Sequence, residues 1–370
     1  MDEEAPAMVS MRWVGVDVHA QESVAAVLES DTGQVRTQRI TGRPGEAVVA
    51  WLQTLPQPLR AVYEAGPTGY GLVRRARAQG LDVVVCAPGH ILKSATDRIK
   101  IDKRDAIRLA RLLSAGELHE VRVPAPDEEQ LRDLVRSREN LRLDLMRCRH
   151  RIGKFLLRRE IFYSQRGESW GTRHRDWLRS IHFDDRASEF AFEDALHAHD
   201  TMLARRDQLE QALSEIAEAS AQAITIGRLR CLRGIDTLTA VGLAAEVGDF
   251  SRFAHPRFLA SYLGLVPSEQ SSGAQRRQGG ITRAGSKHAR RLLVEAAWQY
   301  RYPPRVSSQL ARRQRGHDPR VIDAAWRAQR RLHQRWLRLD QQRGKRRTVV
   351  AVAVARELAT FCWEVATLNS

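Results

Sequence analysis

Apolar and polar residues in the first third of the chain alternate as expected for short strands and amphipathic helices. The pattern predicts three consecutive strands, the last two joined by a hairpin turn, and then helix, strand, helix and strand. In chain order the predicted elements span Trp13–Val18, Ser23–Leu28, Val35–Ile40, residues 45–55, Arg60–Glu64, residues 70–79 and Asp82–Cys86.

This order predicts an α/β domain with a mixed sheet, as in the ribonuclease-H-like (RNase H-like) fold. We place the domain at residues 1–125. In this topology the first and fourth strands are neighbours, so residues at their ends come close together.

The middle of the chain, residues 126–228, carries a heptad pattern in which apolar residues recur at alternating spacings of three and four. The pattern on the first helix comprises Leu131, Leu134, Arg138, Leu141, Leu145, Cys148, Ile152 and Phe155. A later helix continues it with Leu209, Leu213, Ile216, Ser220 and Ala223. Two such helices predict an antiparallel coiled-coil arm, formed within the chain or with a partner. An ordinary helical bundle core would carry the same spacing.

The remaining residues, 229–370, predict a second, mostly helical domain. Its expected helices lie at Thr237–Val247, Phe258–Leu263, Ser286–Tyr300 and Thr348–Val365. A glycine-rich, basic loop is expected at Ser268–Arg283, and an arginine-rich tail at Arg301–Arg347.

The composition of the chain indicates what kind of partner it binds. The chain has 370 residues, of which 43% are hydrophobic, enough for two or more cores. Its net charge of +16 is typical of proteins that neutralise nucleic-acid phosphates, although a solvated surface or an acidic membrane would also suit it. We see no signal peptide, no membrane-spanning stretch and no paired cysteine motif, so we expect a cytoplasmic protein without membrane association.

Two carboxylates interrupt the apolar strands of the first domain. Asp17 shares a strand face with Gly15, while the valines on either side face the other way. A carboxylate on a sheet face is costly unless it is paired or metal-bound, although a hydrogen bond to a turn would also satisfy it. Glu64 ends the strand that we expect beside it, so the two carboxylates would converge.

Asp102 and Asp105 lie three residues apart at the expected start of a helix, and therefore on one helix face. Acids are common there because they compensate the helix dipole. Together with Asp17 and Glu64 they also form a plausible site for two Mg²⁺ ions, with Mn²⁺ as a substitute. Such ions activate the attacking oxygen and stabilise the leaving oxygen in phosphoryl transfer. The acids alone do not say whether water or the protein attacks.

Two features of the last domain could serve phosphate chemistry. Ser271 and Ser272 stand in the basic loop, where a serine among cations can act as a nucleophile, although serines in glycine loops are often plain surface. The segment Leu232–Ala240 is similar to a helix-hairpin-helix turn that holds a phosphate, or else it is a plain helix cap. The cations expected to hold nucleic-acid backbones are Arg276, Arg277, Arg283, Lys287, Arg290 and Arg291.

Several short motifs occur in an order that resembles one family. They are Gly15-Val16-Asp17-Val18, Glu64-Ala65-Gly66, Lys100–Ala106 with Leu109-Ala110, Gly264–Pro267, Ser272-Gly273 and Gly280–Arg283 with Gly285. This combination is similar to the DEDD transposases of the IS110/IS1111 insertion sequences, relatives of the Piv and MooV invertases. Asp236 departs from the family pattern, because it replaces a usual glycine.

The resemblance implies a RuvC-like first domain in which Asp17, Glu64, Asp102 and Asp105 form the acidic tetrad. It also implies a last domain whose serine becomes linked to DNA through a phosphate. Ser272 best matches that serine, with Ser271 beside it. Expected partners are donor and target DNA, a structured non-coding bridge RNA, and further copies of the chain in a homodimer or homotetramer. The setting would be a prokaryotic cytoplasm, at the nucleoid.

The leading hypothesis is therefore an insertion-sequence transposase that cuts and rejoins DNA through a covalent phosphoserine. One rival is a metal-dependent nuclease or Holliday-junction resolvase on the same fold, in which water attacks and the serine is idle. The other is a non-catalytic RNA- or DNA-binding protein with structural acids.

Overall fold

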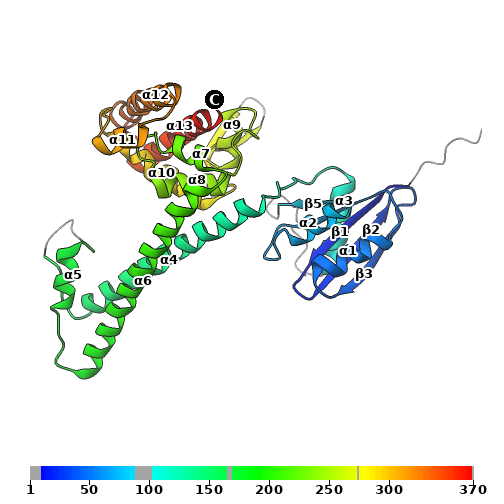
Figure 1. The fold of residues 1–370 in the computed structure, drawn as a ribbon, viewed down its shortest axis with the longest axis horizontal. Helices are drawn as coiled ribbons and strands as arrows, with labels where there is room; N and C mark the ends of the chain where they lie inside the picture. The colour runs from blue at the N-terminus through cyan, green and yellow to red at the C-terminus, as the bar shows by residue number, and fades with distance from the viewer. Residues whose placement is uncertain (1–9, 88–101, 165–168, 273–274, 369–370) are drawn as a thin grey trace, which may run out of the picture. The chain divides into compact units, whose positions relative to one another are not determined.

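A computed structural model describes residues 10–87, 102–164, 169–272 and 275–368. Side chains are described over the same residues except 270–278. The chain divides into two compact units, Met1–Pro124 and Ala125–Ser370, and Figure 1 shows their helices and strands. None of the helices in the described part combines the length and apolar character that a membrane crossing requires.

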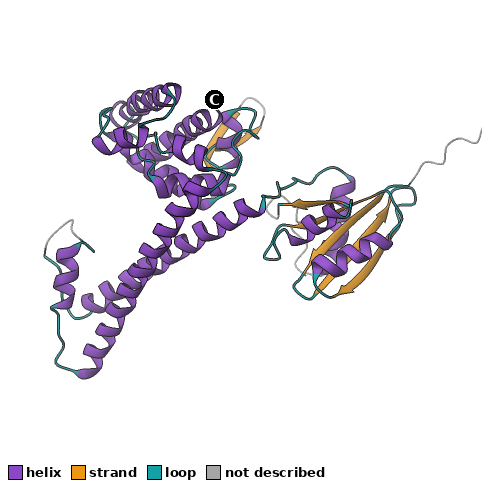
Figure 2. Cartoon of the chain, in the orientation of Figure 1, coloured by secondary structure: helices purple, strands orange, loops and turns teal. Residues whose placement is uncertain are grey.

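The first unit is built on a five-stranded mixed sheet (Figure 2). Its strands are β1 (Arg12–Val18), β2 (Glu22–Glu29), β3 (Val35–Thr41), β4 (Leu59–Glu64) and β5 (Asp82–Cys86). Their order is β3-β2-β1-β4-β5, with β1 antiparallel to β2 and parallel to β4. The predicted strands and the predicted pairing of the first and fourth strands are confirmed.

Helices cover both faces of this sheet. One face packs against α1 (Pro44–Thr54) and α2 (Gly71–Ala78) through a core that includes Val14, Val16 and Leu52. The other face packs against α3 (Asp102–Ser114), whose Ala106, Ala110 and Leu109 are buried against the strands. The strands therefore need apolar residues on both faces, which explains their nearly continuous valine runs.

The second unit begins with two long helices, α4 (Pro126–Leu157) and α6 (Arg186–Ala219), with α5 (Thr172–Arg179) between them in the chain. Hydrogen bonds join Arg138 to Glu210, Cys148 to Ala195 and Arg159 to Ser188. The residue numbers of these partners rise from the start of α4 to its end and fall along α6, so the two helices are antiparallel. Their far ends enclose an aromatic cluster around Phe192.

The predicted heptad seam is correct in part on each helix. On α4, Val135 and Leu156 are buried in place of the predicted Leu134 and Phe155, while the buried positions that match the prediction are Leu131, Leu141, Leu145, Cys148 and Ile152. On α6 the seam departs from the prediction after Leu213. Leu213 is buried, but Ile216 is 48% exposed and Ala217 is buried in its place. Ser220 caps the end of α6, so Ser220 and Ala223 lie beyond the helix. Three-four spacing is compatible with either neighbour, and the packing of the whole helix decides which one faces the core.

The rest of the second unit is a helical core with one β-hairpin. Its helices are α7 (Ala223–Leu229), α8 (Thr237–Val247), α9 (Pro256–Tyr262), α10 (Lys287–Ala297), the 3₁₀ turn η2 (Trp298–Arg301), α11 (Ser308–Gln314), α12 (Pro319–Leu337), the π turn η3 (Arg338–Gln342) and α13 (Arg347–Thr367). The hairpin consists of β6 (Pro267–Ser272) and β7 (Gln275–Ile281).

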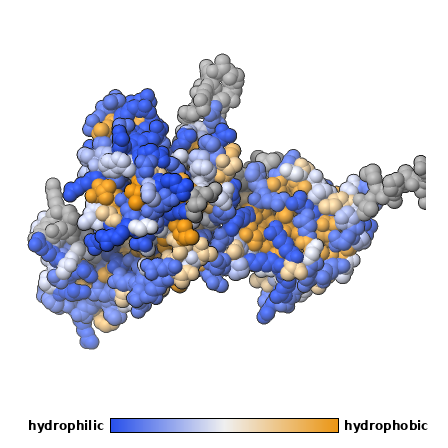
Figure 3. Space-filling view, turned by 45° about the horizontal axis from the view of Figure 1, so that its top comes forward, coloured by the Kyte–Doolittle hydropathy of each residue, from blue (hydrophilic) through white to orange (hydrophobic). Residues whose placement is uncertain are grey.

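Two sequence expectations for this part were wrong. The predicted basic loop is the β6–β7 hairpin. The predicted tail folds into α11 and α12, whose buried stripe includes Ala324, Leu332 and Trp336. Many of its arginines are paired, for example Arg327 with Asp323 and Glu364. Hydrophilic residues cover most of the visible surface of this unit, with scattered apolar patches (Figure 3).

Candidate active site

The end of β1 brings Asp17 to the sheet face that α3 covers. Val14 and Val16 are buried on the opposite face, so strand alternation puts Gly15 and Asp17 on the α3 face. A Cβ on Gly15 would lie 2.2 Å from the carbonyl oxygen of Ala106, so α3 packs directly on the backbone of β1. Asp17 comes two residues after Gly15 and therefore lies on the same face, just beyond this contact.

The start of α3 places the second carboxylate beside Asp17. Asp102 is the first residue of α3, one helical turn before Ala106. The close contact of Ala106 with Gly15 therefore fixes Asp102 at the level of Asp17. Dipole compensation accounts for an acid at this helix start, and the approach to Asp17 is an additional feature.

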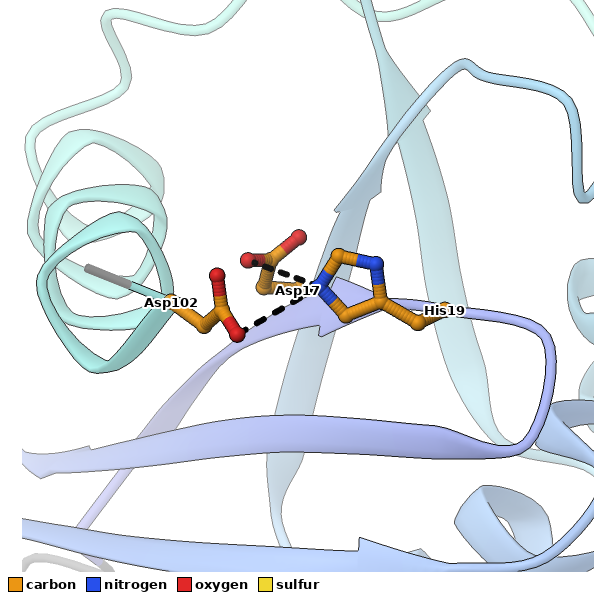
Figure 4. Close-up of side chains that lie close together, drawn as sticks. All are labelled: Asp17, His19 and Asp102. Carbon is orange, nitrogen blue, oxygen red and sulfur yellow. Dashed lines mark ion pairs between the residues drawn. The ribbon is translucent and has the colours of Figure 1, made fainter. Parts of the chain in front are cut away.

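The ring of a histidine faces both of these carboxylates (Figure 4). His19 Nε2 is 3.6 Å from Asp17 Oδ2 and 3.6 Å from Asp102 Oδ2. One ligand atom from each of the three residues lies within 4.8 Å of the other two. Asp17 is 19% exposed, whereas His19 and Asp102 are 44% and 42% exposed, so the cluster is open to solvent.

The structure places the other two predicted acids nearby but outside this cluster. Glu64 ends β4 on the α3 face, and the pairing of Val16 with Tyr63 puts it level with Asp17 on the neighbouring strand. Asp105 lies in the first turn of α3 and accepts a hydrogen bond from Arg108 at 3.4 Å. Two of the four acids thus converge directly, and the other two border them.

The predicted serine lies in the second unit. Ser272 is the last residue of β6 and pairs with Gln275, while Ser271 pairs with Arg276 and Gln270 pairs with Arg277. For these residues the description covers the backbone. Gly273, quoted with Ser272 in the sequence motif, lies outside the described residues.

The predicted nucleic-acid cations of α10 and the preceding turn fall into two groups. Arg283 and Lys287 are exposed. Arg290 instead donates to the carbonyl oxygens of Leu263 at 3.1 Å and Gly285 at 3.2 Å, and also to that of Ala284. It therefore braces the turn between the hairpin and α10.

Arg291 is also held within the protein. Its guanidinium pairs with Glu139 of α4 at 2.7 Å and with Glu295 of its own helix at 2.6 Å. Arg291 is 23% exposed, so much of its guanidinium is covered by the protein.

A groove of about 870 Å³ adjoins the base of the hairpin. Its apolar floor includes Leu265, Ile281 and Val352. The cationic side chains that line it are Arg257, Arg331, Arg335 and Arg356. Glu357 pairs with Arg331 and Arg335, each at 3.1 Å, which leaves the lining with a net positive charge.

The turn before α8 is a helix cap. Asp236 has an extended backbone, and its side chain accepts a hydrogen bond from the Thr239 backbone N–H at 2.8 Å. The cap interpretation is therefore confirmed, and this N–H is already occupied by the Asp236 side chain.

Comparison with known proteins identifies the chain. A family model described as "Transposase" of the DEDD IS110 type matches residues 14–160. A second, described as "Transposase IS116/IS110/IS902 family", matches residues 227–311. A putative transposase, y4qE, of Sinorhizobium fredii is 40% identical over 96% of this chain and 88% of its own length. The chain belongs to the IS110 family of DEDD transposases.

Two further relatives extend this comparison. The transposase for insertion sequence element IS1533 of Leptospira borgpetersenii is 32% identical over 90% of this transposase and 98% of its own length. A pilin gene-inverting protein of Moraxella bovis is 24% identical over 98% of the chain and 97% of its own length. As a DNA transposase, the protein is an enzyme.

The donor set of the acidic cluster suits a divalent cation. Carboxylate oxygens are ligands for Mg²⁺ and Mn²⁺, and an imidazole nitrogen suits transition metals. Sequence reasoning on this transposase considered only the acids and missed His19. The signal was present, since Asp17 and His19 are two residues apart in extended chain and therefore leave it on the same side.

Proposed function

We propose that this transposase cuts and rejoins donor and target DNA through a covalent serine–phosphate intermediate, with a divalent cation at Asp17, Glu64, Asp102 and Asp105. The convergence of Asp17 and Asp102 across the Gly15–Ala106 contact carries this proposal. Two acids from distant parts of the sequence meet there, and their carboxylate oxygens are ligands that a divalent cation prefers.

Bound there, Mg²⁺ or Mn²⁺ would supply positive charge that lowers the barrier to phosphoryl transfer. Ser272 supplies the nucleophile. Its hydroxyl oxygen forms a bond to the DNA phosphorus as the bond from phosphorus to a DNA oxygen breaks. The serine proton leaves, and the departing DNA oxygen takes up a proton.

A second DNA 3′-hydroxyl then attacks the same phosphorus and regenerates the Ser272 hydroxyl. Each step exchanges one phosphodiester for another of similar energy, so strand transfer requires no ATP. Water in place of the second 3′-hydroxyl would give cleavage alone.

The second unit is the proposed nucleic-acid surface. Arg283 and Lys287 are exposed close to the hairpin in sequence, and the cationic groove adjoins the hairpin base. Arg276 and Arg277 lie on the strand that pairs with the serine strand. Backbone phosphates at these cations would bring a strand to Ser272 without sequence readout.

Further parts of the proposal concern architecture and partners. The β3-β2-β1-β4-β5 order supports an RNase H-like, RuvC-like first domain, and the antiparallel α4–α6 pair supports a coiled-coil arm at residues 126–228. The C-terminal transposase domain would comprise residues 229–370. We further propose a bridge RNA that supplies target sequence, a homodimer or homotetramer, and action at the nucleoid in the cytoplasm.

Covalent capture tests the serine. The full-length protein is expressed with the DNA that flanks its gene, so that any guide RNA is made with it, and is then incubated with Mg²⁺ and end-labelled flanking DNA. We expect a DNA-linked protein band that survives denaturation, with the nucleotide mapped to Ser272 by mass spectrometry.

Matched variants decide the assignment. Ser272→Ala should abolish the adduct, whereas Ser271→Ala should retain it. Loss in Ser271→Ala alone would transfer the role to Ser271. Cleaved DNA without any protein-linked product would replace the proposal with the nuclease or resolvase alternative.

A further inference from the structure

His19 is held in place by the turn that joins β1 to β2. It follows Val18, the last residue of β1, and its backbone N–H donates to the carbonyl oxygen of Glu22 at 2.9 Å. Because β1 is in turn pinned by α3 at Gly15, the imidazole starts from a fixed backbone position. Figure 4 shows its ring directed toward both carboxylates.

The distances around His19 Nε2 fit side chains that bind one common metal ion better than they fit hydrogen-bonded pairs. At 3.6 Å, neither Asp17 Oδ2 nor Asp102 Oδ2 is within ordinary hydrogen-bond range of Nε2. Two atoms that bind one ion at about 2.1 Å lie roughly 3.0–3.4 Å apart. Both carboxylate oxygens are therefore within a few tenths of an ångström, roughly 0.2–0.6 Å, of the spacing that ligands of a common ion adopt with Nε2.

We infer that His19 Nε2 is itself a ligand of the divalent cation, and that it gives the site a preference for Mn²⁺ and Co²⁺ over Mg²⁺. The inference rests on the proposed metal site and adds one nitrogen to its oxygen donors. Mg²⁺ favours oxygen ligands and retained water, whereas affinity for nitrogen donors rises along the first transition series. An exposed imidazole beside two carboxylates is accessible to an ion from solvent.

The competing account makes His19 a cation that pairs with both carboxylates in the absence of metal. In that account an incoming ion displaces the imidazole, and no nitrogen is bonded to the metal. The two accounts differ in a spectroscopic signature rather than in activity.

Pulsed electron paramagnetic resonance of the full-length protein loaded with Mn²⁺ separates them. We expect modulation from a directly bonded ¹⁴N nucleus, replaced by a ¹⁵N signal when the protein is made with ¹⁵N-labelled histidine. His19→Ala should remove this coupling and weaken Mn²⁺ binding on the order of 10-fold or more, with a smaller change for Mg²⁺.

Two control variants keep the result interpretable. His119→Ala changes an exposed histidine of the same unit and should leave the coupling intact. Asp17→Asn should abolish Mn²⁺ binding if the proposed metal site exists. Mn²⁺ bound in an Asp17-dependent way without nitrogen coupling would overturn the role of His19 alone. Mn²⁺ binding unaffected by Asp17→Asn would overturn the metal site itself.

Discussion

Gly15 of β1 and Ala106 of α3 are in such close contact that a Cβ on the glycine would lie 2.2 Å from the Ala106 carbonyl oxygen. This contact sets the height at which α3 delivers Asp102 to Asp17. Gly15→Ala must therefore push α3 away from the sheet. We expect destabilisation of about 1–3 kcal/mol or more, together with weaker divalent-cation binding.

Urea denaturation followed by circular dichroism measures the first effect, and Mn²⁺ titration measures the second. Gly71→Ala is the matched control, because a Cβ there meets no atom within 4 Å. It should leave cation binding unchanged and alter stability by less than about 1 kcal/mol. Wild-type behaviour of Gly15→Ala would mean that the contact does not position Asp102.

Leu213 and Ile216 test which face of α6 packs in the core. Leu213 is 2% exposed and Ile216 is 48% exposed. Leu213→Ala should destabilise the protein by about 2–5 kcal/mol, because it leaves a cavity among buried side chains. Ile216→Ala should cost less than about 1 kcal/mol. Urea midpoints of the two variants decide the matter, and equal losses would restore the heptad register expected from sequence.

The N-terminal sheet could be predicted because each strand carries its own signal. The valine runs around Val14 and Val84 are short, apolar and bounded by turn residues. The hairpin β6–β7 could not be predicted in the same way. Its strands are polar and β7 contains Gly279 and Gly280, so local sequence reads as a loop and tertiary packing decides.

The sequence drew attention to Asp17 and Asp102, which the structure brings together, but not to His19, which lies beside both. Asp17 was recognisable because it is a charged residue within an apolar strand. His19 follows that strand in a turn, where a histidine is common and gives no signal by itself. Among the predicted cations, sequence could not distinguish Arg290 from Lys287. The difference arises from the backbone carbonyls that the folded turn presents to Arg290.

This difference between Arg290 and Lys287 gives a third prediction. Lys287→Ala should weaken DNA binding and reduce the slope of log affinity against log salt by about 1, because one phosphate contact is lost. Arg290→Ala should leave that slope unchanged and destabilise the protein by about 1–3 kcal/mol, because carbonyl oxygens lose their donor. Fluorescence anisotropy at several salt concentrations measures the slope, and urea denaturation measures stability. A reduced slope in Arg290→Ala would return Arg290 to the phosphate contacts.

Glu246 of α8 gives a prediction about pH. It is 6% exposed, with Arg136 Nε 3.3 Å and His288 Nδ1 3.7 Å from Oε1. Burial raises its pKa, but the nearby His288 imidazole and the charge of Arg136 outweigh burial and lower the pKa to about 2. Because the folded pKa lies below the usual 4.5, ionised Glu246 stabilises the fold above pH 4.5. That contribution, about 3 kcal/mol, disappears as pH falls from 4.5 toward 2.

Glu246→Gln should therefore cost about 3 kcal/mol at pH 7 and flatten the acid side of the stability curve by a similar amount. Urea denaturation between pH 7 and about pH 3, followed by tryptophan fluorescence, measures both effects. Glu218→Gln changes an exposed carboxylate of α6 and should follow the wild-type curve. Glu139, which also contacts His288 and also has a lowered pKa, is present in all three proteins and contributes to the acid sensitivity that remains in Glu246→Gln. Glu246→Gln could instead lose as much stability on acidification as the wild type. In that case the acid sensitivity would come from other carboxylates, and the contacts of Glu246 with α4 and α10 would not stabilise the fold.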